Sequence, residues 1–580
     1  MNLDQNIEKK IKEWTSTPYE KECIEEIQAL VDKEDEKELI ERFGAELDFG
    51  TGGIRGIIGY GTNRMNIYVI AKATQGLANY ILKNNIKEPK AVIAYDSRIY
   101  SQEFAKKTAT VLASNGIKTY IFRELRPTPE LSFAIRYLKC TTGVVITASH
   151  NPKEYNGYKA YWDDGAQVIA PHDTGIIEEV RKIKDLSQVK DASFDDLIDK
   201  KMIEWIGEEV DDAFIDEIIK LSINREKIKE TDVKIVFTPL HGTGGTLIPK
   251  AMKKLGMAEP IYVDSQMKPD PNFSTVAYPN PEEKEALTLA INRAKETSAD
   301  MLIATDPDAD RMGIAVRNKD GEYEIVTGNQ IGSILEFYIL SEKKARYELP
   351  KNGAVVKTIV TTELQSDIAN DFDIKIFNTL TGFKYIGQKI RQFENDKNYQ
   401  YIFGGEESYG YLTGTHARDK DAIASALMIA ECCAYLKNAG MSILDFLNNI
   451  YSRYGYYIES LESRSLKGLT GQEVISRIME YFREHGLNNL GRIKTKKIID
   501  YKNDLVYDAS NSQYTLPKSN VIQFFLEDDS KITLRPSGTE PKIKFYFSSK
   551  GVSLDDSKNK VELLKKEFMQ IVDKIIEEES

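Results

Sequence analysis

Short apolar runs rich in β-branched residues alternate with longer helical patterns along most of this chain, and this alternation restricts the fold more than any other feature. Near-continuous apolar strands separated by helices predict parallel or mixed β-sheets that are covered by helices on both faces. The expected helices include Ser101–Ser114, Glu282–Glu296 and Asn329–Ser341. The expected strands are Ala91–Tyr95, Thr119–Phe122, Val144–Thr147, Lys234–Thr238, Met301–Thr305, Ala354–Val360 and Tyr401–Phe403.

The alternation starts afresh near Ala91, Val233 and Ala354, which indicates three related α/β units. From about Tyr456 the pattern changes to a helix and hairpin-like strands, closed by a helix over Lys558–Glu578, which is typical of an α+β unit. With 580 residues the chain is too long for a single core. We therefore predict an α/β protein with an N-terminal helical extension (1–45), three related α/β domains (46–211, 212–325 and 326–455) and a C-terminal α+β domain (456–580).

The composition is that of an ordinary globular protein, with 41% hydrophobic and 29% charged residues. The net charge of −12 argues against non-specific binding to nucleic acid or membranes. Because the sequence shows neither a signal peptide nor a long apolar segment, a cytoplasmic location is expected. The four cysteines are too few and badly spaced for a disulfide framework and are expected in the core, and the five histidines lack zinc-site spacing.

Ser149 lies in the string Thr147-Ala148-Ser149-His150-Asn151-Pro152, directly after an expected strand. Its hydroxyl is therefore expected at the carboxyl end of a sheet, where ligands bind in open α/β folds. A lone serine in a loop is more often a turn former than a nucleophile. Here the whole string, with His150 beside it and Asn156-Gly157-Tyr158-Lys159 behind it, favours a nucleophile.

Asp306, Asp308 and Asp310 alternate in a turn that follows the apolar run Met301–Ala304. A calcium EF-hand is excluded because its sixth and twelfth loop positions would be Arg311 and Arg317. An aspartyl-phosphate phosphatase, in which Asp306 would be the nucleophile, remains a rival. A solvated acidic turn is unattractive because three carboxylates in so few residues repel one another. The best interpretation is one Mg²⁺ held by the carboxylates and a bridging phosphate oxygen.

Two further loops carry polar groups suited to a phosphosugar. Arg535, Ser537, Gly538 and Thr539 supply a charged fork, two hydroxyls and a glycine that exposes N–H groups, a set typical of phosphate binding. Gly405-Glu406-Glu407-Ser408-Tyr409-Gly410 offers Glu406 and Ser408 to vicinal hydroxyls, although such strings are common on surfaces.

The glycine runs Gly50–Gly56 and Gly242–Gly245 both miss the Gly-x-Gly-x-x-Gly spacing of a dinucleotide site, and no Walker A string occurs. Arg55, in the first run, is about equally suited to a phosphate contact and to a structural ion pair.

These four loops, in this order and at these separations, resemble those of the α-D-phosphohexomutase superfamily, the phosphoglucomutases and phosphomannomutases. The resemblance extends from about Phe49 to Phe547. It implies four domains around a central cleft, with one loop from each domain. It also implies a phosphoserine at Ser149, with Mg²⁺ held by that phosphate and by Asp306, Asp308 and Asp310.

The resemblance further implies a sugar loop at Glu406 and Ser408, a cleft lysine in Thr381-Gly382-Phe383-Lys384 and a basic string at Arg418-Asp419-Lys420. Candidate acid, base or charge-stabilising groups are Lys159, Arg311 and Lys384. The implied reaction exchanges phosphate between two positions of one sugar through a hexose 1,6-bisphosphate, which also serves as activator.

The form Glu-Glu-Ser-Tyr-Gly favours glucose over mannose phosphates. The long N-terminal segment is similar to the branch that includes phosphopentomutases, so phosphomannomutase and phosphopentomutase activities stay open. A Mg²⁺-dependent sugar phosphatase and a non-catalytic binding protein are the other hypotheses. A small phosphosugar is the only expected partner, and the chain is expected to be a monomer or a homodimer.

Overall fold

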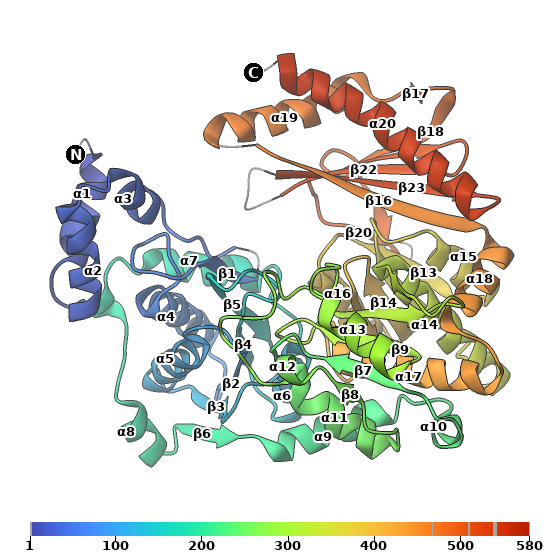
Figure 1. The fold of residues 1–580 in the computed structure, drawn as a ribbon. Helices are drawn as coiled ribbons and strands as arrows, with labels where there is room; N and C mark the ends of the chain where they lie inside the picture. The colour runs from blue at the N-terminus through green and yellow to red at the C-terminus, as the bar shows by residue number, and fades with distance from the viewer. Residues whose placement is uncertain (1–2, 51, 467, 509–510, 538–541, 579–580) are drawn as a thin grey trace. The chain divides into compact units, whose positions relative to one another are not determined.

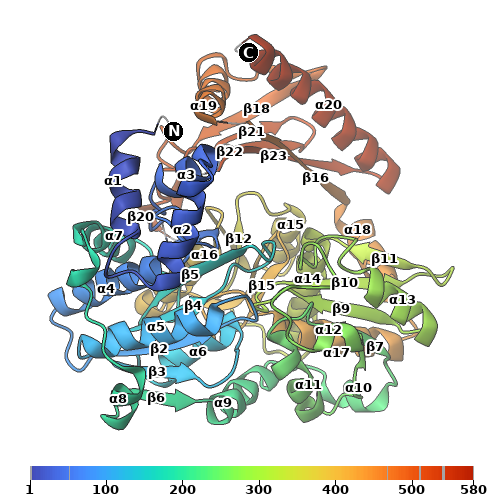
Figure 2. The same ribbon diagram turned by 60° about the vertical axis from the view of Figure 1, so that its left-hand side comes forward.

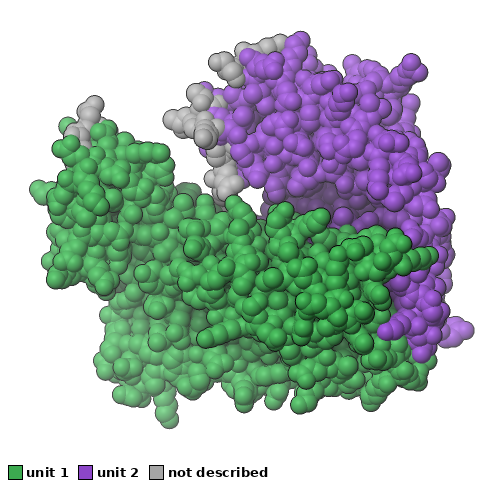
Figure 3. Space-filling model, in the orientation of Figure 1, with its two compact units in different colours: residues 1–325, 410–434 green, residues 326–409, 435–580 purple. Residues whose placement is uncertain are grey.

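The computed structural model describes residues 3–50, 52–466, 468–508, 511–537 and 542–578, and it divides into two compact units. The first unit contains Met1–Ile325 and Gly410–Ala434, and the second contains Val326–Tyr409 and Tyr435–Ser580 (Figure 3). The chain thus leaves the first unit, returns to it for 25 residues and leaves it again. No helix within the described ranges is both long and apolar enough to cross a membrane.

Three amphipathic helices open the first unit: α1 (Gln5–Trp14), α2 (Lys21–Asp32) and α3 (Glu36–Phe43) (Figure 1). Their apolar faces form a separate small core around Trp14, which packs edge-on against Tyr68 of α4 (Ile67–Lys83). The predicted N-terminal helices are therefore confirmed.

The first sheet has the order β1-β5-β4-β2-β3-β6. Its centre is parallel, because β2 pairs in parallel with both β3 and β4, whereas β5 runs antiparallel to β4 and β1. Helices α4, α5 (Ser101–Ser114), α6 (Thr128–Tyr137) and α7 (His172–Lys182) pack around it, and α8 (Phe194–Asp199) and α9 (Glu208–Ile219) follow. The strands are β1 (Gly53–Ile57), β2 (Lys90–Tyr95), β3 (Lys118–Phe122), β4 (Thr142–Ile146), β5 (Tyr155–Trp162) and β6 (Ile203–Ile206).

The second sheet has the order β11-β10-β9-β7-β8, again with a parallel centre formed by β9, β7 and β8. Its helices are α10 (Arg225–Glu230), α11 (Gly244–Leu255), α12 (Asp264–Met267) and α13 (Thr288–Thr297). Its strands are β7 (Ile235–Thr238), β8 (Ile261–Tyr262), β9 (Met301–Thr305), β10 (Met312–Arg317) and β11 (Tyr323–Val326).

The second unit begins with a parallel arrangement in which β12 (Gly353–Thr358) lies between β13 (Lys375–Thr379) and β14 (Gln400–Glu406). Helices α14 (Gly328–Ala345), α15 (Leu364–Asp371) and α16 (Phe383–Asp396) accompany these strands, and α18 (Ile443–Tyr454) packs on α14. After β14, the chain passes through β15 (Gly410–Thr413) and α17 (Ala422–Asn438).

The C-terminal part of the second unit is a sheet of order β16-β23-β22-β21-β18-β17 in which every pairing is antiparallel. Figure 2 shows helices α19 (Gly468–His485) and α20 (Leu554–Glu578) over this sheet. The Phe568 ring of α20 stacks on the Phe482 ring of α19. The strands are β16 (Tyr456–Ser465), β17 (Asn489–Leu490), β18 (Ile493–Asp500), β21 (Ile522–Leu526), β22 (Lys531–Pro536) and β23 (Lys542–Gly551). Two further strands, β19 (Tyr507–Asp508) and β20 (Asn511–Thr515), form a separate antiparallel pair.

The predicted strands are all confirmed, with ends within three residues of those expected, and the four cysteines are buried as predicted. The predicted helix Glu282–Glu296 is wrong at its start, because α13 begins only at Thr288. Residues before it form successive turns, in which the Asn280 side chain accepts the Glu282 N–H. Glu282 also forms an ion pair with Arg311, with 2.5 Å between Glu282 Oε1 and Arg311 Nη1. These contacts with residues outside the segment override the local helical pattern.

Candidate active site

Ser149 projects from the loop that follows β4, as the sequence predicts. It is buried, and its backbone adopts the left-handed conformation with φ of 52°. Its N–H donates to Thr147 Oγ1 at 2.8 Å, while its hydroxyl donates to Asp306 Oδ2 at 2.7 Å. A left-handed non-glycine residue in a loop stores strain that points to a functional role.

Asp306, Asp308 and Asp310 lie in the loop after β9 and converge as predicted. One oxygen from each carboxylate lies within 4.8 Å of the others, and all three side chains are buried. Among the described residues, Asp308 Oδ1 and Asp310 Oδ1 are buried oxygens with no hydrogen-bond partner. Burial and the two neighbouring carboxylates raise the pKa of Asp306 well above its usual value. This cluster of hard oxygen donors fits a divalent cation, which would offset the mutual repulsion.

Two lysines and a threonine surround the carboxylates. Lys159 Nζ, on β5, lies 2.9 Å from Asp308 Oδ2 and 3.5 Å from Asp310 Oδ2. Lys420 Nζ lies 3.1 Å from Asp310 Oδ2, and Thr128 Oγ1 donates to Asp308 Oδ2 at 3.0 Å. Burial opposes the charge on Lys159, but Asp308 and Asp310 outweigh it and raise the pKa of this lysine. The loop therefore faces fixed positive charge.

His150 and Arg55 also contact the Ser149 loop. His150 Nδ1 lies 3.2 Å from Ser149 Oγ, and Arg55 donates to Asn151 Oδ1 at 3.1 Å. Burial, reinforced by Arg311 and Arg55, lowers the pKa of His150 well below its usual value. His150 is therefore neutral at physiological pH, with one ring nitrogen able to accept a proton.

Arg311 is placed by β10 beside the carboxylate loop. Its N–H donates to Asp306 Oδ1 at 3.0 Å, and its guanidinium pairs with Glu282. The glycine run Gly242–Gly245 supports the same loop from behind. A Cβ at Gly242 would lie 2.3 Å from Pro307 Cα, and the Thr243 N–H and hydroxyl both donate to the Pro307 carbonyl. These glycines serve close packing rather than nucleotide binding.

In the second unit, Glu406 ends β14 and is held by the segment that contains Lys384. The N–H of Gly382 donates to Glu406 Oε1 at 2.9 Å. Thr381 precedes that glycine and Lys384 lies two positions after it. The Lys384 ammonium lies 5.2 Å from the centre of the Tyr385 ring. Ser408 is half-buried in the same loop, and Tyr409 beside it is left-handed with φ of 63°.

Arg535 lies near the end of β22, and its guanidinium approaches the Tyr546 hydroxyl at 3.4 Å. Burial and the neighbouring Glu406 raise the pKa of Glu407 to about 7, while Arg535 and Lys544 act in the opposite direction. The second unit therefore brings the predicted sugar loop and the predicted phosphate loop within electrostatic reach of each other. The Ser537 N–H donates to the Lys542 carbonyl at 2.7 Å, whereas Gly538 and Thr539 lie outside the described residues.

Three models of known protein domains match the parts of the chain that carry the Ser149 loop, the aspartate loop and the Glu406 loop. They are described as phosphoglucomutase/phosphomannomutase, alpha/beta/alpha domains I, II and III, and they match residues 46–187, 212–321 and 327–454. The chain belongs to the phosphoglucomutase/phosphomannomutase family. This membership confirms the resemblance and the predicted fold class, and it makes the chain a phosphohexomutase, an intramolecular phosphotransferase.

Curated relatives extend the match over nearly the whole chain. A phosphoglucomutase of Staphylococcus haemolyticus is 39% identical over 512 residues, which is 87% of this chain and 91% of the relative. A phosphoglucomutase of Staphylococcus aureus is 39% identical over 542 residues, which is 92% of this chain and 95% of the relative.

Solved structures share the fold of this phosphohexomutase at lower identity. The open form of the exocytosis-sensitive phosphoprotein parafusin, a phosphoglucomutase from Paramecium, has a TM-score of 0.67 at 19% identity, covering 92% of this chain and 95% of that chain. A phosphoglucomutase/phosphomannomutase family protein from Burkholderia thailandensis has a TM-score of 0.66 at 17% identity, covering 92% and 98%.

One predicted binding residue of the phosphohexomutase is deeply buried. Arg418 is 1% exposed, and its guanidinium donates to the main-chain carbonyls of Thr415 and Ala417. Its own N–H donates to Ser132 Oγ at 2.8 Å. Arg418 thereby shapes the turn that presents Lys420 to Asp310.

Sequence analysis did not identify Thr128, Glu407 or Arg98 as parts of the site of this phosphohexomutase. Thr128 is the first residue of α6 and carried no local signal. Glu407 was visible beside Glu406, but its contact with Thr358 Oγ1 at 3.3 Å depends on the fold. Arg98 belongs to the polar string Asp96-Ser97-Arg98, which directly follows the predicted strand Ala91–Tyr95. Ser149 also lies in a loop after a predicted strand, so this shared position could have identified Arg98 as a candidate site residue.

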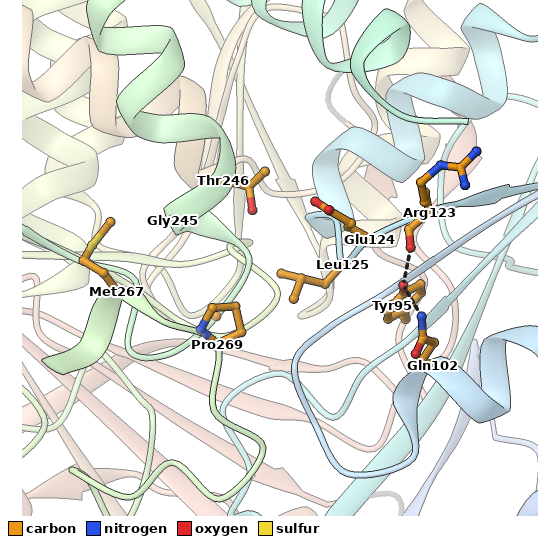
Figure 4. A pocket seen from close by; sticks show the side chains of 10 residues that line it. Tyr95, Gln102, Arg123, Glu124, Leu125, Gly245, Thr246, Met267 and Pro269 are labelled. Atoms are coloured by element: carbon orange, nitrogen blue, oxygen red, sulfur yellow. Dashed lines mark hydrogen bonds between the residues drawn. The ribbon is translucent and has the colours of Figure 1, made fainter. Parts of the chain in front are cut away.

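The first unit also holds a cavity of about 510 Å³, whose wall includes Gly242 of the glycine run that packs against Pro307. Figure 4 shows its lining, which includes Tyr95, Gln102, Arg123 and Thr246. No residue that was predicted to act in the phosphohexomutase reaction lines it, so the cavity is not the predicted site.

Proposed function

We propose that this phosphohexomutase is a phosphoglucomutase, which interconverts glucose 1-phosphate and glucose 6-phosphate with Ser149 as the phosphoryl carrier. The observation that supports this most directly is the strained, buried Ser149, whose hydroxyl lies 2.7 Å from a carboxylate of the aspartate cluster. The 39% identity to staphylococcal phosphoglucomutases supports glucose phosphate as the substrate class.

The reaction consists of two phosphoryl transfers. In the first, the bond between phosphorus and Ser149 Oγ breaks and Ser149 Oγ takes up a proton, while a bond forms from phosphorus to the oxygen of the free sugar hydroxyl, which loses its proton to a base. The product is hexose 1,6-bisphosphate. In the second, its other phosphate passes to Ser149 Oγ, and the released sugar oxygen takes a proton. In this step Ser149 Oγ gives up its proton, whose hydrogen bond Asp306 Oδ2 accepts at 2.7 Å, while His150 Nδ1 lies 3.2 Å from the same oxygen.

Charged groups of the first unit stabilise these transfers. Lys159, Lys420 and the Arg311 guanidinium, whose Nε lies 3.8 Å from Asp310 Oδ1, provide positive charge beside the carboxylates, where negative charge grows on the transferring group. Arg55 reaches the same loop through Asn151. One Mg²⁺ per chain would be held by Asp306, Asp308, Asp310 and the phosphate on Ser149. When bound, it supplies charge neutralisation for the phosphoryl oxygens.

Residues of the second unit recognise the sugar and the phosphate that does not react. Glu406 and Ser408 bind sugar hydroxyls, and Thr381 and Lys384 complete this set. Arg535 and Ser537, with Gly538 and Thr539, bind the distal phosphate through a charged fork and hydroxyls. Because the sugar must turn over between the two transfers, this anchor has to accept either end of the molecule.

A substrate panel tests the proposal. Purified protein with Mg²⁺ and a trace of glucose 1,6-bisphosphate is incubated separately with glucose, mannose and ribose 1-phosphates, and isomer and free phosphate are both measured. Glucose 6-phosphate as the fastest product is expected. A faster reaction with mannose or ribose phosphate assigns a different mutase, and free phosphate without isomer assigns a phosphatase.

The carrier role of Ser149 is tested by Ser149→Ala. The variant should lose turnover by a factor of at least about 10⁴, because no nucleophile remains. Intact-mass analysis after bisphosphate treatment should show one phosphoryl adduct on the wild-type chain and none on the variant. Isomerisation by the variant, or an adduct at another residue, contradicts the mechanism.

A further inference from the structure

Arg98 lies behind the Ser149 loop and has no part in the chemistry described above. It follows β2 in the string Asp96-Ser97-Arg98, and its side chain is fully buried. A guanidinium without solvent must direct its N–H groups at protein acceptors, because each unmet buried donor is costly. The direction of those donors therefore reports the role of the residue.

Four of its N–H groups point at main-chain carbonyls of one short segment. Nη2 lies 2.5 Å from the carbonyl oxygens of both Ser149 and Asn151. Nη1 lies 2.7 Å from the Pro152 carbonyl and 3.0 Å from the Tyr155 carbonyl. A single rigid group thus binds four carbonyls of the segment that runs from the turn after β4 to the first residue of β5.

The charge and position of Arg98 are fixed from the opposite side. Its Nε lies 3.3 Å from Asp96 Oδ2, and that carboxylate is also fully buried. Asp96 Oδ1 accepts from Ser101 Oγ at 2.8 Å, and Ser101 in turn accepts from the Asn156 side chain at 3.0 Å. The Phe273 ring covers the guanidinium at 5.0 Å.

The turn needs such support because Ser149 is left-handed, with φ of 52°. That conformation is costly for a residue with a Cβ and persists only where surrounding contacts impose it. If the turn relaxed, Ser149 Oγ would move away from Asp306.

We propose that Arg98 is a positioning residue for phosphoryl transfer: by binding the Ser149, Asn151, Pro152 and Tyr155 carbonyls it holds the left-handed turn that directs the Ser149 hydroxyl at Asp306. This inference rests on the proposed carrier role of Ser149. The bridge uses the four Nη donors of one planar fork. A lysine, with three donors on one nitrogen, keeps the charge but cannot serve carbonyls that lie in different directions.

The test compares Arg98→Lys with Arg64→Lys. Arg64 is a similarly buried arginine that also binds main-chain carbonyls, those of Glu41 and Asn63, away from the Ser149 loop. In Arg98→Lys, kcat should fall about 10- to 100-fold, as expected for a small misplacement of a reacting group, while KM for glucose 1-phosphate stays within about twofold. The Arg64→Lys enzyme should keep both constants near wild type.

Hydrogen exchange distinguishes a local change in the Ser149 loop from a general loss of stability, which would speed amide exchange in β4 as well. In Arg98→Lys, amides of residues 148–155 should exchange about tenfold faster or more, while β4 exchanges as in the wild type. Formation of the Ser149 phosphoryl adduct from glucose 1,6-bisphosphate should slow in parallel. An unchanged kcat, or a KM that rises while the loop stays protected, overturns the proposal.

If Arg98→Lys does not fold, Asp96→Asn provides the second variant, because it removes the charged partner of Arg98 and keeps the shape. It should shift kcat and loop exchange in the same direction, and wild-type values of both overturn the proposal. Ser149→Ala, measured alongside, separates the two claims. Turnover in Ser149→Ala refutes the proposed function itself, whereas a null result confined to the Arg98 and Asp96 variants refutes only the positioning role.

Discussion

At the scale of single residues, the aspartate cluster contains a buried oxygen that a cation could meet. Asp308 has one oxygen engaged by Lys159 and Thr128, and its other oxygen is buried without a hydrogen-bond partner among the described residues. Because a buried carboxylate oxygen left unpaired is costly, this atom is well placed to meet a cation. Asp199, at the end of α8, is also an aspartate, but its side chain is exposed and it is not part of the cluster.

We therefore predict that Mg²⁺ raises the melting temperature of the wild-type protein and that Asp308→Asn abolishes the rise. At about 100 times the dissociation constant the ion should stabilise the folded state by about 2.7 kcal/mol. Chelation should remove mutase activity, and added Mg²⁺ should restore it. Differential scanning fluorimetry measures the first effect, with Asp199→Asn as a control that keeps the full shift. Full activity of Asp308→Asn in excess chelator would argue against a metal site.

At the scale of elements, Asn66 links the loop after β1 to the helix that follows it. Its Oδ1 caps α4 by accepting the N–H groups of Tyr68 and Val69, at 3.1 and 3.0 Å. Its Nδ2 lies 3.0 Å from each of the carbonyls of Gly59, Gly61 and Arg64. The Asn66 side chain thus fixes both the start of α4 and the loop that follows β1, the strand that contains Arg55.

Asn66→Ala should lower the free energy of unfolding of the first unit by about 3 kcal/mol. The substitution removes a helix cap and leaves buried carbonyls without their hydrogen-bond donor. Ser193→Ala, which removes an exposed cap of α8 with a single 3.5 Å bond, should cost less than about 1 kcal/mol. Urea denaturation followed by circular dichroism compares the two variants. Equal losses would show that the loop contacts of Asn66 contribute nothing.

The elements also show what the sequence could and could not predict. Strands such as Met301–Thr305 were predicted closely because continuous apolar runs reflect burial on both faces, a local property. The start of α13 was predicted wrongly because Asn280 and Arg311 impose turns through contacts outside the helical pattern. The aspartate cluster was predictable because its three residues lie within five positions of the sequence. The Arg98 bridge was not, since its acceptors lie more than 50 residues further along the chain.

At the scale of the whole molecule, the predicted site residues are divided between the two compact units of the chain. Residues 410–434 return to the first unit after β14, and this return places Lys420 beside Asp310 and Asp419 beside Tyr161. No local pattern predicts such a return, because partners such as Tyr161 and Asp419 are 258 positions apart in sequence. The transfer groups belong to the first unit, and the predicted sugar and phosphate loops belong to the second.

This division predicts that a variant in the second unit impairs binding rather than phosphoryl transfer. Arg535→Ala should raise KM for glucose 1-phosphate about 10- to 150-fold, which corresponds to about 1.5–3 kcal/mol for a lost charge-assisted hydrogen bond. It should also release more glucose 1,6-bisphosphate during turnover, because the same anchor holds the intermediate in both orientations. Steady-state kinetics and a bisphosphate assay measure both effects, and Arg492→Ala, an exposed arginine of the same domain, should show neither. If Arg535→Ala leaves KM and bisphosphate release unchanged, the C-terminal domain does not hold the distal phosphate, and the anchor must be sought among the other basic residues.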